Sequence, residues 1–314
     1  MNLRAKLVKI SDICKFLTIF LQICKKSCTF APDMNAISLY SIVPVRGDAR
    51  EGAEQETQML FGELCEVLEQ QERWTRIRLE ADGQTGWVDA KMICPMSEDE
   101  YRSHREALQD AAIVAFPMAY AISENNGQTI PLTAGTKLTN YQLQMTNEAS
   151  TARFEVLGVG FRIDPSFVLT APRELNRDNL LQTVRFFLNT PYLWGGKNAL
   201  GMDCSGFTQI ILSLFGKHLL RNASQQATQG EPVPDLSLAQ AGDLAFFDHY
   251  EPTANSQKPI ANSQPHISHV GIVIDPERII HCSGRVKVEK LDSTGIFNPE
   301  TGTYSHQLIQ IRRL

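Results

Sequence analysis

The chain has 314 residues, of which 43% are hydrophobic and 21% are charged, and its formal net charge at pH 7 is -5. This composition is typical of folded globular domains and excludes wholesale disorder. The length allows two or three domains with substantial cores. The slightly acidic balance, without a long run of Lys and Arg, gives no reason to expect binding to nucleic acid.

Residues 1–36 form a separate N-terminal segment in which lysines precede an apolar stretch at residues 16–21. The stretch is too short for a stable membrane span, and a signal-peptide interpretation lacks a clean small-x-small cleavage site. Residues 21–24, Leu-Gln-Ile-Cys, match a lipoprotein attachment box only faintly, and another interpretation is that translation starts at Met34. We expect a cytoplasmic protein, with a periplasmic or lipid-anchored location as the alternatives.

The seven cysteines are an odd number at scattered spacings, so they do not predict a disulfide framework. Cys24 and Cys28 form a single C-x-x-x-C pair without a second pair, so we expect no structural zinc site. Mostly buried thiols in a reducing compartment are the simpler interpretation. We expect neither a metal nor a cofactor.

Short strands are predicted across residues 37–98. Residues 60–69 begin with a turn and then alternate apolar and polar positions, residues 74–79 also alternate, and glycines precede residues 86–88. Regularly spaced short strands with glycine-containing turns predict a small barrel. The pattern Leu-x-Gly-Glu, Trp-x-x-Ile and Gly-Trp-Val resembles bacterial SH3 domains, which implies an SH3-like barrel here.

Residues 99–172 have a less regular pattern. An apolar stretch covers residues 111–120, and residues 130–138 and 154–161 are typical of strands around turns. We expect either a second, degenerate SH3-like barrel or a linker domain.

An α+β domain is predicted over residues 173–314. Residues 178–188 have the apolar spacing of a helix, and a second helix begins near Cys204, with its apolar stripe starting at Phe207 and a C-terminal cap at Gly216. Strands are expected at residues 244–247, 270–274, 279–282 and 308–311, and an exposed loop at residues 250–264. Helices followed by strands favour an α+β fold.

Cys204 lies where the second predicted helix begins. Unpaired backbone N–H groups and the helix dipole favour an anion there, which lowers a thiol pKa and increases the thiolate fraction. A buried, inert cysteine is the alternative. It fits less well, because Cys204 lies between the polar residues Asp203 and Ser205, ahead of the apolar stripe.

His269 and His281 flank a predicted hairpin whose turn is at residues 275–277. In an antiparallel hairpin centred near Asp275 the two histidines lie directly opposite and share one face. One imidazole then acts as the base toward Cys204, and the other orients it.

A zinc site formed by Cys204, His269 and His281 is the competing interpretation. It lacks an evident fourth ligand, because His249, His266 and Cys282 have no convincing spacing.

Six segments, in chain order, resemble the NlpC-type cell-wall cysteine peptidases. They are residues 191–196, 203–207, 221–226, 242–247, 269–273 and 280–284. The resemblance covers residues 177–314 and implies a papain-like α+β fold that hydrolyses peptide bonds beside D-glutamate in bacterial murein peptides. It implies Cys204 as nucleophile, His269 as general base and His281 as the orienting third member. By the same resemblance, the Tyr192 hydroxyl and the backbone N–H of Cys204 stabilise the oxyanion.

SH3-like barrels ahead of such a domain are similar to the γ-D-glutamyl-L-diamino acid endopeptidases, or dipeptidyl peptidases VI. That group releases L-Ala-D-Glu from murein peptides whose L-alanine has a free amine. The resemblance implies that Glu56 and Asp203 bind the ammonium, and that Ser205 and Ser224 hold the D-glutamyl group. The chain departs from the group at Gln84, where related barrels have a tyrosine that faces the active site.

The expected partner is therefore a murein-derived peptide, L-Ala-γ-D-Glu-L-diamino acid. One alternative function is an exported murein D,L-endopeptidase that remodels the wall. Another is a non-catalytic murein-binding protein, which the presence of Cys204, His269 and His281 disfavours. A third is an acyltransferase on the same fold, since a thioester can pass to an amine as well as to water.

Overall fold

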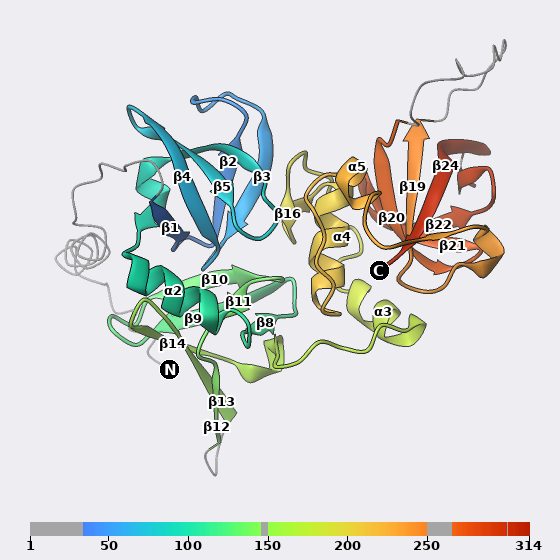
Figure 1. Ribbon diagram of the computed structural model, residues 1–314. Coiled ribbons are helices and arrows are strands. Elements are labelled where there is room, and N and C mark those ends of the chain that lie inside the picture. The colour runs from blue at the N-terminus through green and yellow to red at the C-terminus, as the bar shows by residue number, and fades with distance from the viewer. Residues whose placement is uncertain (1–33, 146–149, 250–265, 300) are drawn as a thin grey trace, which may run out of the picture.

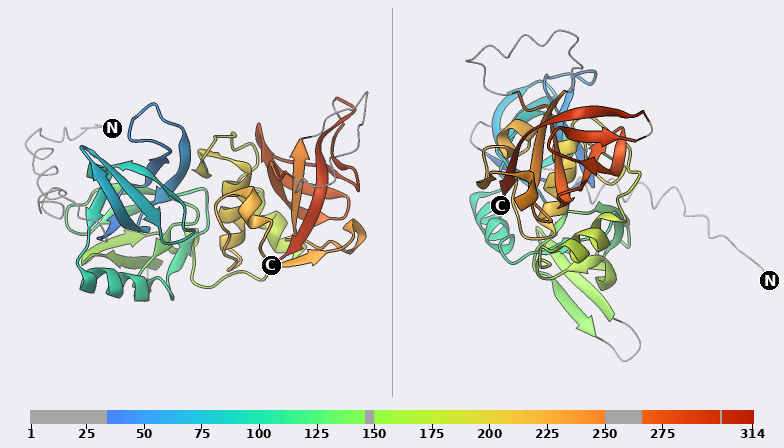
Figure 2. Two further views of the ribbon diagram at one scale, coloured as in Figure 1. Left: turned by 45° about the horizontal axis from the view of Figure 1, so that its top comes forward. Right: turned by 90° about the vertical axis from the view of Figure 1, so that its right-hand side faces the viewer.

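The computed structural model describes residues 34–145, 150–249, 266–299 and 301–314. Two β-rich units come first and an α+β domain follows (Figure 1). Figure 2 shows the β-rich units at one end of the molecule and the C-terminal sheet at the other, with helix α4 (Cys204–Ser213) between them. The predicted all-β N-terminal region and α+β C-terminal domain are thus confirmed. The predictions for residues 1–33 and 250–264 lie outside the described residues.

The first unit is a seven-stranded antiparallel sheet in the order β3-β2-β6-β5-β4-β1-β7. Its elements are β1 (Asn35–Ser38), β2 (Ile42–Arg46), β3 (Gln55–Leu60), β4 (Leu64–Gln71), β5 (Trp74–Leu79), β6 (Thr85–Asp89), the 3-10 helix η1 (Ala90–Met92) and β7 (Ile93–Pro95). In β5, Thr75, Ile77 and Leu79 are buried while Arg76 and Arg78 are exposed. The alternation in the sequence therefore places one face of β5 on the core.

Helix α2 (Glu98–Ala107) connects the two β-rich units and is not among the elements predicted from the sequence. A capping box fixes its start: Ser97 Oγ accepts the Glu100 N–H at 3.3 Å, and the Glu100 carboxylate accepts the Ser97 N–H at 2.7 Å. Ser-x-x-Glu at residues 97–100 is the local signal that identifies this helix.

The second unit consists of a five-stranded and a three-stranded sheet. Its elements are β8 (Ala112–Val114), β9 (Met118–Ser123), β10 (Thr129–Thr133), β11 (Lys137–Leu138), β12 (Gln142–Met145), β13 (Ser150–Val156), β14 (Val159–Ile163), η2 (Pro165–Phe167) and β15 (Val168–Leu169). Phe61 of the first unit packs edge-on against Phe154 and Phe161 of the second. The two units therefore share one buried hydrophobic cluster, and the first unit has a second cluster of its own.

The C-terminal domain places three helices and a short hairpin ahead of its main sheet. These elements are α3 (Arg177–Val184), β16 (Lys197–Asn198), β17 (Gly201–Met202), α4 and α5 (Ala223–Gln226). The sheet contains β18 (Glu231–Val233), β19 (Leu244–His249), β20 (His269–Asp275), β21 (Arg278–Ser283), β22 (Arg285–Leu291), β23 (Gly295–Asn298) and β24 (Thr303–Arg313), with η3 (Leu236–Leu238) beside it. Because β24 pairs with both β19 and β23, the strands from β19 to β24 close on themselves.

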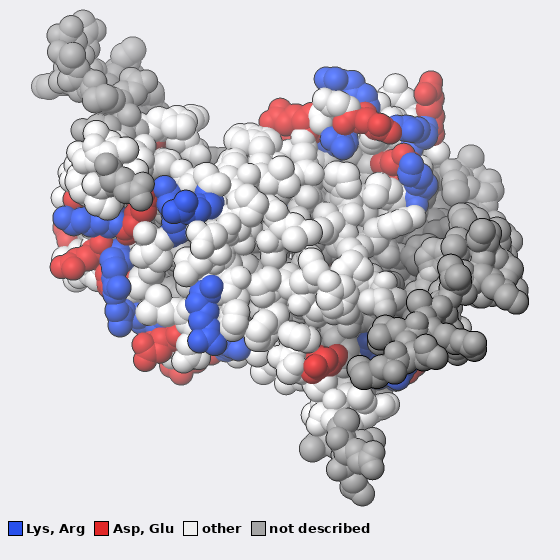
Figure 3. Space-filling model, turned by 180° about the vertical axis from the view of Figure 1, so that it is seen from behind, with Lys and Arg blue, Asp and Glu red and all other residues white. Residues whose placement is uncertain are grey.

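Charge is distributed without a dominant sign on the face seen in Figure 3. Lys and Arg atoms there lie close to Asp and Glu atoms, with uncharged atoms between these groups. Across the parts of the chain that the structure describes, no helix is long and apolar enough to cross a bilayer.

The register of the β20–β21 hairpin differs from the prediction. Gly271, not His269, lies opposite His281, and Asp275 pairs with Arg278, so the turn is Pro276-Glu277. His269 is consequently the diagonal neighbour of His281 on the same face, which still lies within reach of long side chains. The predicted face is right and the predicted pairing is wrong, because the turn lies further along the chain than expected.

Gly271 makes this diagonal contact possible. A Cβ atom added at Gly271 would lie 2.8 Å from Cβ of His281 and 2.7 Å from Cδ1 of Ile279. These distances are shorter than van der Waals contact, and the Cβ atom of His281 is fixed next to the backbone, so it cannot move aside without a shift of its strand. The absence of a side chain at Gly271 therefore leaves the space that His281 occupies.

We expect Gly271→Ala to lower the free energy of unfolding by about 1–3 kcal/mol, because the added methyl overpacks the hairpin. Urea unfolding measures the change. Gly52→Ala is the control, since a Cβ there meets only Nη1 of Arg50 at 3.7 Å. Identical unfolding midpoints for Gly271→Ala and Gly52→Ala would contradict the steric role of Gly271.

Candidate active site

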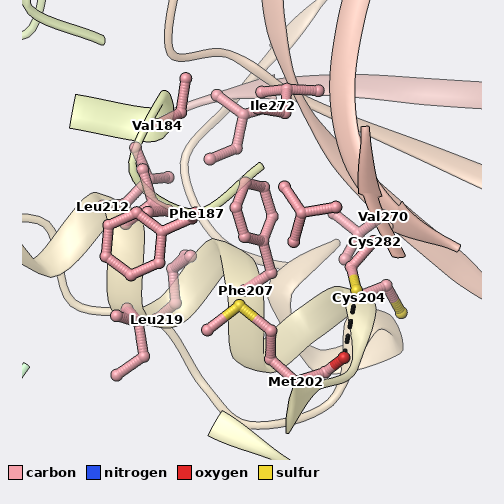
Figure 4. Close-up of a cluster of buried hydrophobic side chains, with 14 of the residues drawn as sticks. Val184, Phe187, Met202, Cys204, Phe207, Leu212, Leu219, Val270, Ile272 and Cys282 are labelled. Carbon is pink, nitrogen blue, oxygen red and sulfur yellow. Dashed lines mark hydrogen bonds between the residues drawn. The ribbon is translucent and has the colours of Figure 1, made fainter. Parts of the chain in front are cut away.

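Cys204 is the first residue of α4, as the sequence predicts. The Asp203 carboxylate caps the helix by accepting the Gly206 N–H at 2.7 Å. The apolar face of α4, including Phe207 and Ile211, packs on β20 and β21. Figure 4 shows Cys204 at the edge of this core, beside Val270 and Cys282. The packing of α4 thus fixes the thiol at the border between core and cleft.

The two predicted histidines meet behind the cleft. His269 Nε2 and His281 Nδ1 are 2.7 Å apart, and the two rings are nearly perpendicular. His281 is completely buried, and its Nε2 lies 2.8 Å from Glu289 Oε2. His269 also lines the cleft together with Cys204, so it is the histidine of the pair that a substrate can reach.

Burial favours the uncharged forms of His269 and Cys204. It holds the pKa of His269 well below the ordinary value of 6.5, with His281 and His306 acting in the same direction. Burial also raises the pKa of the Cys204 thiol to about 12, together with the Asp203 charge, against backbone hydrogen bonds from Val270 and Ser205. The predicted lowering of the Cys204 pKa by the helix end is therefore outweighed. The thiolate forms only when a base takes the proton.

A cleft of about 560 Å³ lies over Cys204 and brings together most of the predicted site residues. It is lined by Glu56, Tyr192, Asp203, Cys204, Ser205, Ser224 and His269, and also by Trp194, Asn222, His249, His266 and His306. Of the predicted site residues, His281 is the one that does not line the cleft. The cleft therefore has one wall from the first barrel, through Glu56 of β3, and the others from the C-terminal domain.

Arg221 is a site residue whose role the sequence analysis does not identify, although it lies within a family-like segment. Its side chain is 1% exposed. Nη1 and Nη2 lie 3.1 and 2.6 Å from the two carboxylate oxygens of Asp203, Nη1 donates to Ser205 Oγ at 2.9 Å, and Nε donates to Thr57 Oγ1 at 2.7 Å. A guanidinium thus ties the barrel strand β3 to the start of α4.

The carboxylate of Asp203 already accepts these hydrogen bonds. They compete with its predicted role, which is to bind the ammonium group of the substrate. Besides Arg221 and Gly206, its carboxylate accepts the Gly195 N–H at 3.0 Å. Glu56, by contrast, lines the cleft without an ion pair to any residue that the structure describes. Ammonium binding by either residue stays a prediction, and Glu56 is the carboxylate without a competing cation.

Tyr192 and Ser224 line the same cleft. Burial raises the pKa of the Tyr192 hydroxyl, so this group keeps its proton and remains a hydrogen-bond donor. The Tyr192 N–H donates to Gly284 O at 2.9 Å, which fixes the backbone beside the cleft. Ser224 is exposed in the short helix α5. The predicted oxyanion and substrate contacts of these residues stay predictions.

Further contacts across the junction support the barrel wall. Gln58 Oε1 accepts the Lys197 N–H at 2.9 Å and the Asn198 side-chain amide at 2.7 Å. Lys197 Nζ pairs with Glu63 at 2.8 Å. Gln84, at the position of the expected tyrosine, contacts Asn222 at 3.4 Å and does not line the cleft. The junction is therefore a polar, interlocked contact.

His306 is the other buried group that the sequence analysis does not identify. Its ring stacks on that of His269 with centroids 4.2 Å apart, and burial lowers its pKa to about 4. His306 is thus a neutral ring that supports the base. No cluster of three or more His, Cys, Asp or Glu residues able to hold a metal ion occurs among the placed residues.

Comparisons with known proteins agree with this geometry. Residues 189–305 match the NlpC/P60 family, and residues 45–93 match the bacterial dipeptidyl-peptidase Sh3 domain. The chain is 28% identical over 265 residues to the gamma-D-glutamyl-L-lysine dipeptidyl-peptidase of Bacillus subtilis, covering 82% of this chain and 80% of that protein. It is 24% identical over 266 residues to the protein of that name from Bacillus cereus, covering 79% of this chain and 74% of the relative.

A solved structure shows the same fold. The crystal structure of an NlpC/P60 family protein from Bacillus cereus superposes with a TM-score of 0.71 at 18% identity, covering 89% of this chain and 99% of that one. The cysteine at the helix start, the histidine pair and these matches lead to one conclusion. The chain carries an NlpC/P60 cysteine peptidase domain at residues 189–305, behind a bacterial dipeptidyl-peptidase Sh3 domain at residues 45–93.

Proposed function

We propose that this peptidase hydrolyses the γ-D-Glu–L-diamino acid bond of murein peptides with a free N-terminal L-Ala, releasing L-Ala-D-Glu. The observation that carries the proposal is Glu56, a barrel carboxylate without a charged partner in the cleft of Cys204. A carboxylate on a partly closed wall is suited to bind an ammonium group. Relatives named gamma-D-glutamyl-L-lysine dipeptidyl-peptidase support the same substrate class.

The chemistry begins with a neutral thiol and a neutral imidazole. His269 takes the proton of Cys204 as the sulfur attacks the γ-carbonyl carbon of D-glutamate. The backbone N–H of Cys204 and the Tyr192 hydroxyl hold the oxyanion. His269 returns the proton to the leaving amine, and water, deprotonated by His269, hydrolyses the thioester.

Selectivity follows from the barrel wall. In this proposal the ammonium of L-Ala binds Glu56, and Arg221 neutralises the charge of Asp203 nearby. A peptide attached to sugar through its L-Ala lacks the ammonium and adds bulk toward the barrel. The enzyme therefore acts on free peptides, in keeping with recycling in the cytoplasm.

Cys204→Ala is expected to abolish release of L-Ala-D-Glu from L-Ala-γ-D-Glu-L-Lys, because it removes the sulfur that forms the thioester in the proposed mechanism. Mass spectrometry of the products measures the reaction, and an unchanged unfolding midpoint shows that the variant is folded. Equal cleavage of intact, sugar-linked murein by the wild type would instead support the wall-remodelling function.

Glu56→Gln is expected to lower kcat/KM for the free-amine tripeptide by about 10- to 100-fold, through loss of a charge-assisted contact to the ammonium. The N-acetylated tripeptide, which has no ammonium, should be cleaved equally by both enzymes. Glu54→Gln is the matched control, since Glu54 carries the same charge on the same segment but is outside the cleft lining. Equal losses for Glu54→Gln and Glu56→Gln would contradict ammonium binding by Glu56.

The acid limb of the pH–kcat profile is expected well below pH 6.5. Burial lowers the pKa of His269, so the ring stays neutral and able to accept a proton until the pH falls through that lowered value. Steady-state rates between pH 4 and 8 measure the profile, with unfolding midpoints recorded at each pH. An acid limb centred at or above pH 6.5 would contradict a desolvated base.

A further inference from the structure

His281 has a second partner beyond His269. The carboxylate Oε2 of Glu289 on β22 lies 2.8 Å from His281 Nε2, on the side of the ring away from His269. The Glu289 side chain is 9% exposed, and Lys287 Nζ lies 3.0 Å from the same oxygen. The nucleophile's base therefore belongs to a chain of hydrogen bonds that ends on a nearly buried carboxylate.

Three adjacent strands place this chain of side chains on one line. His281 of β21 lies opposite Gly271 of β20 and opposite Lys287 of β22. His269 is two residues before Gly271, and Glu289 is two residues after Lys287, so both are diagonal neighbours of His281 on the same face. The line His269, His281 and Glu289 thus follows from the register of β20, β21 and β22.

The surroundings of Glu289 keep it ionised. Burial raises its pKa, but hydrogen bonds from His281 and Lys287 outweigh this effect and lower it. Arg285 and Lys287 line a second cleft of about 440 Å³ together with Glu289, and no other acidic residue lines that cleft. A carboxylate among cationic groups is an acceptor without a proton to donate.

Because the Glu289 carboxylate only accepts hydrogen bonds, it determines which ring nitrogen carries the proton in His281 and in His269. His281 Nε2 must carry a proton to bond Glu289, so in the neutral ring Nδ1 is the acceptor. His269 Nε2 must then donate to His281 Nδ1 across the 2.7 Å contact. The free lone pair of neutral His269 is consequently on Nδ1, the nitrogen that remains to take a proton from Cys204.

We propose that Glu289 is a positioning residue that sets the tautomers of His281 and His269 and stabilises the positive charge that His269 acquires when it takes the Cys204 proton. Glu289 acts through His281 and does not touch the substrate. The inference rests on the Cys204–His269 chemistry of the proposed function, and it is independent of which peptide is cleaved.

Two variants of Glu289 separate its roles. Glu289→Leu removes the acceptor and the charge, and Glu289→Gln keeps an acceptor oxygen and the shape. We expect kcat to fall by about 10- to 100-fold in Glu289→Leu with KM nearly unchanged, as for other residues that orient a reacting histidine, and to fall less in Glu289→Gln. Glu277→Gln, at the exposed turn of the same hairpin, is the matched control for loss of one negative charge.

Nitrogen-15 NMR of histidine-labelled protein measures the tautomers of the two rings. A purely structural role of Glu289 would leave these tautomers unchanged. Both rings should show the Nε2–H tautomer in the wild type and in Glu277→Gln, and a mixture of tautomers in Glu289→Leu. Unchanged tautomers together with kcat within about twofold of the wild type in both Glu289 variants would overturn the proposal. If Glu289→Leu does not fold, Glu289→Ala, which also removes the acceptor, takes its place in the same two measurements.

Alkylation of Cys204 by iodoacetamide near neutral pH separates this proposal from the proposed function. Its rate depends on proton transfer to His269 but not on a peptide substrate. If the wild type does not cleave the tripeptide, the substrate assignment is contradicted. If alkylation is nevertheless slower in Glu289→Leu than in the wild type, and unchanged in Glu277→Gln, the role of Glu289 is supported. An alkylation rate that is equal in all these proteins argues against Glu289.

Discussion

The buried ion pair between Arg221 and Asp203 is the interaction on which the rest of the site depends. A guanidinium that is 1% exposed is stable only when its donors are satisfied, and here Asp203, Ser205 and Thr57 satisfy them. Asp203 in turn caps the helix that begins with Cys204. One set of hydrogen bonds therefore links the position of Cys204 to the docking of the barrel.

Desolvation determines the form of the resting enzyme. The same burial that fixes Cys204 and His269 disfavours charge on both, so the pair rests as thiol and imidazole. Charge appears only during the reaction, when a proton crosses from sulfur to nitrogen. The groups around the pair act on that transient charge. Glu289 lies behind the two histidines, and the neutral ring of His306 stacks on His269.

Local patterns are sufficient to predict the strands of the C-terminal sheet and the start of α4 at Cys204, because each depends on a short stretch of sequence. The hairpin pairing was wrong because Asp275, Pro276 and Glu277 are all suitable turn residues and only packing around Gly271 selects among them. Helix α2 also has a local signal, the capping box of Ser97 and Glu100. The contact between Glu289 and His281 depends on the register of separate strands, which no local pattern specifies.

The shared core of the two N-terminal β units has a consequence for how such enzymes change specificity. Phe61 of the first unit packs edge-on against Phe154 and Phe161 of the second, so the cluster around these rings is complete only when both units are present. The wall that carries Glu56 is consequently not an exchangeable module. Recombination that replaced the first barrel by itself would expose an aromatic cluster, so new substrate walls are expected to arise by drift within the pair or by transfer of both units together.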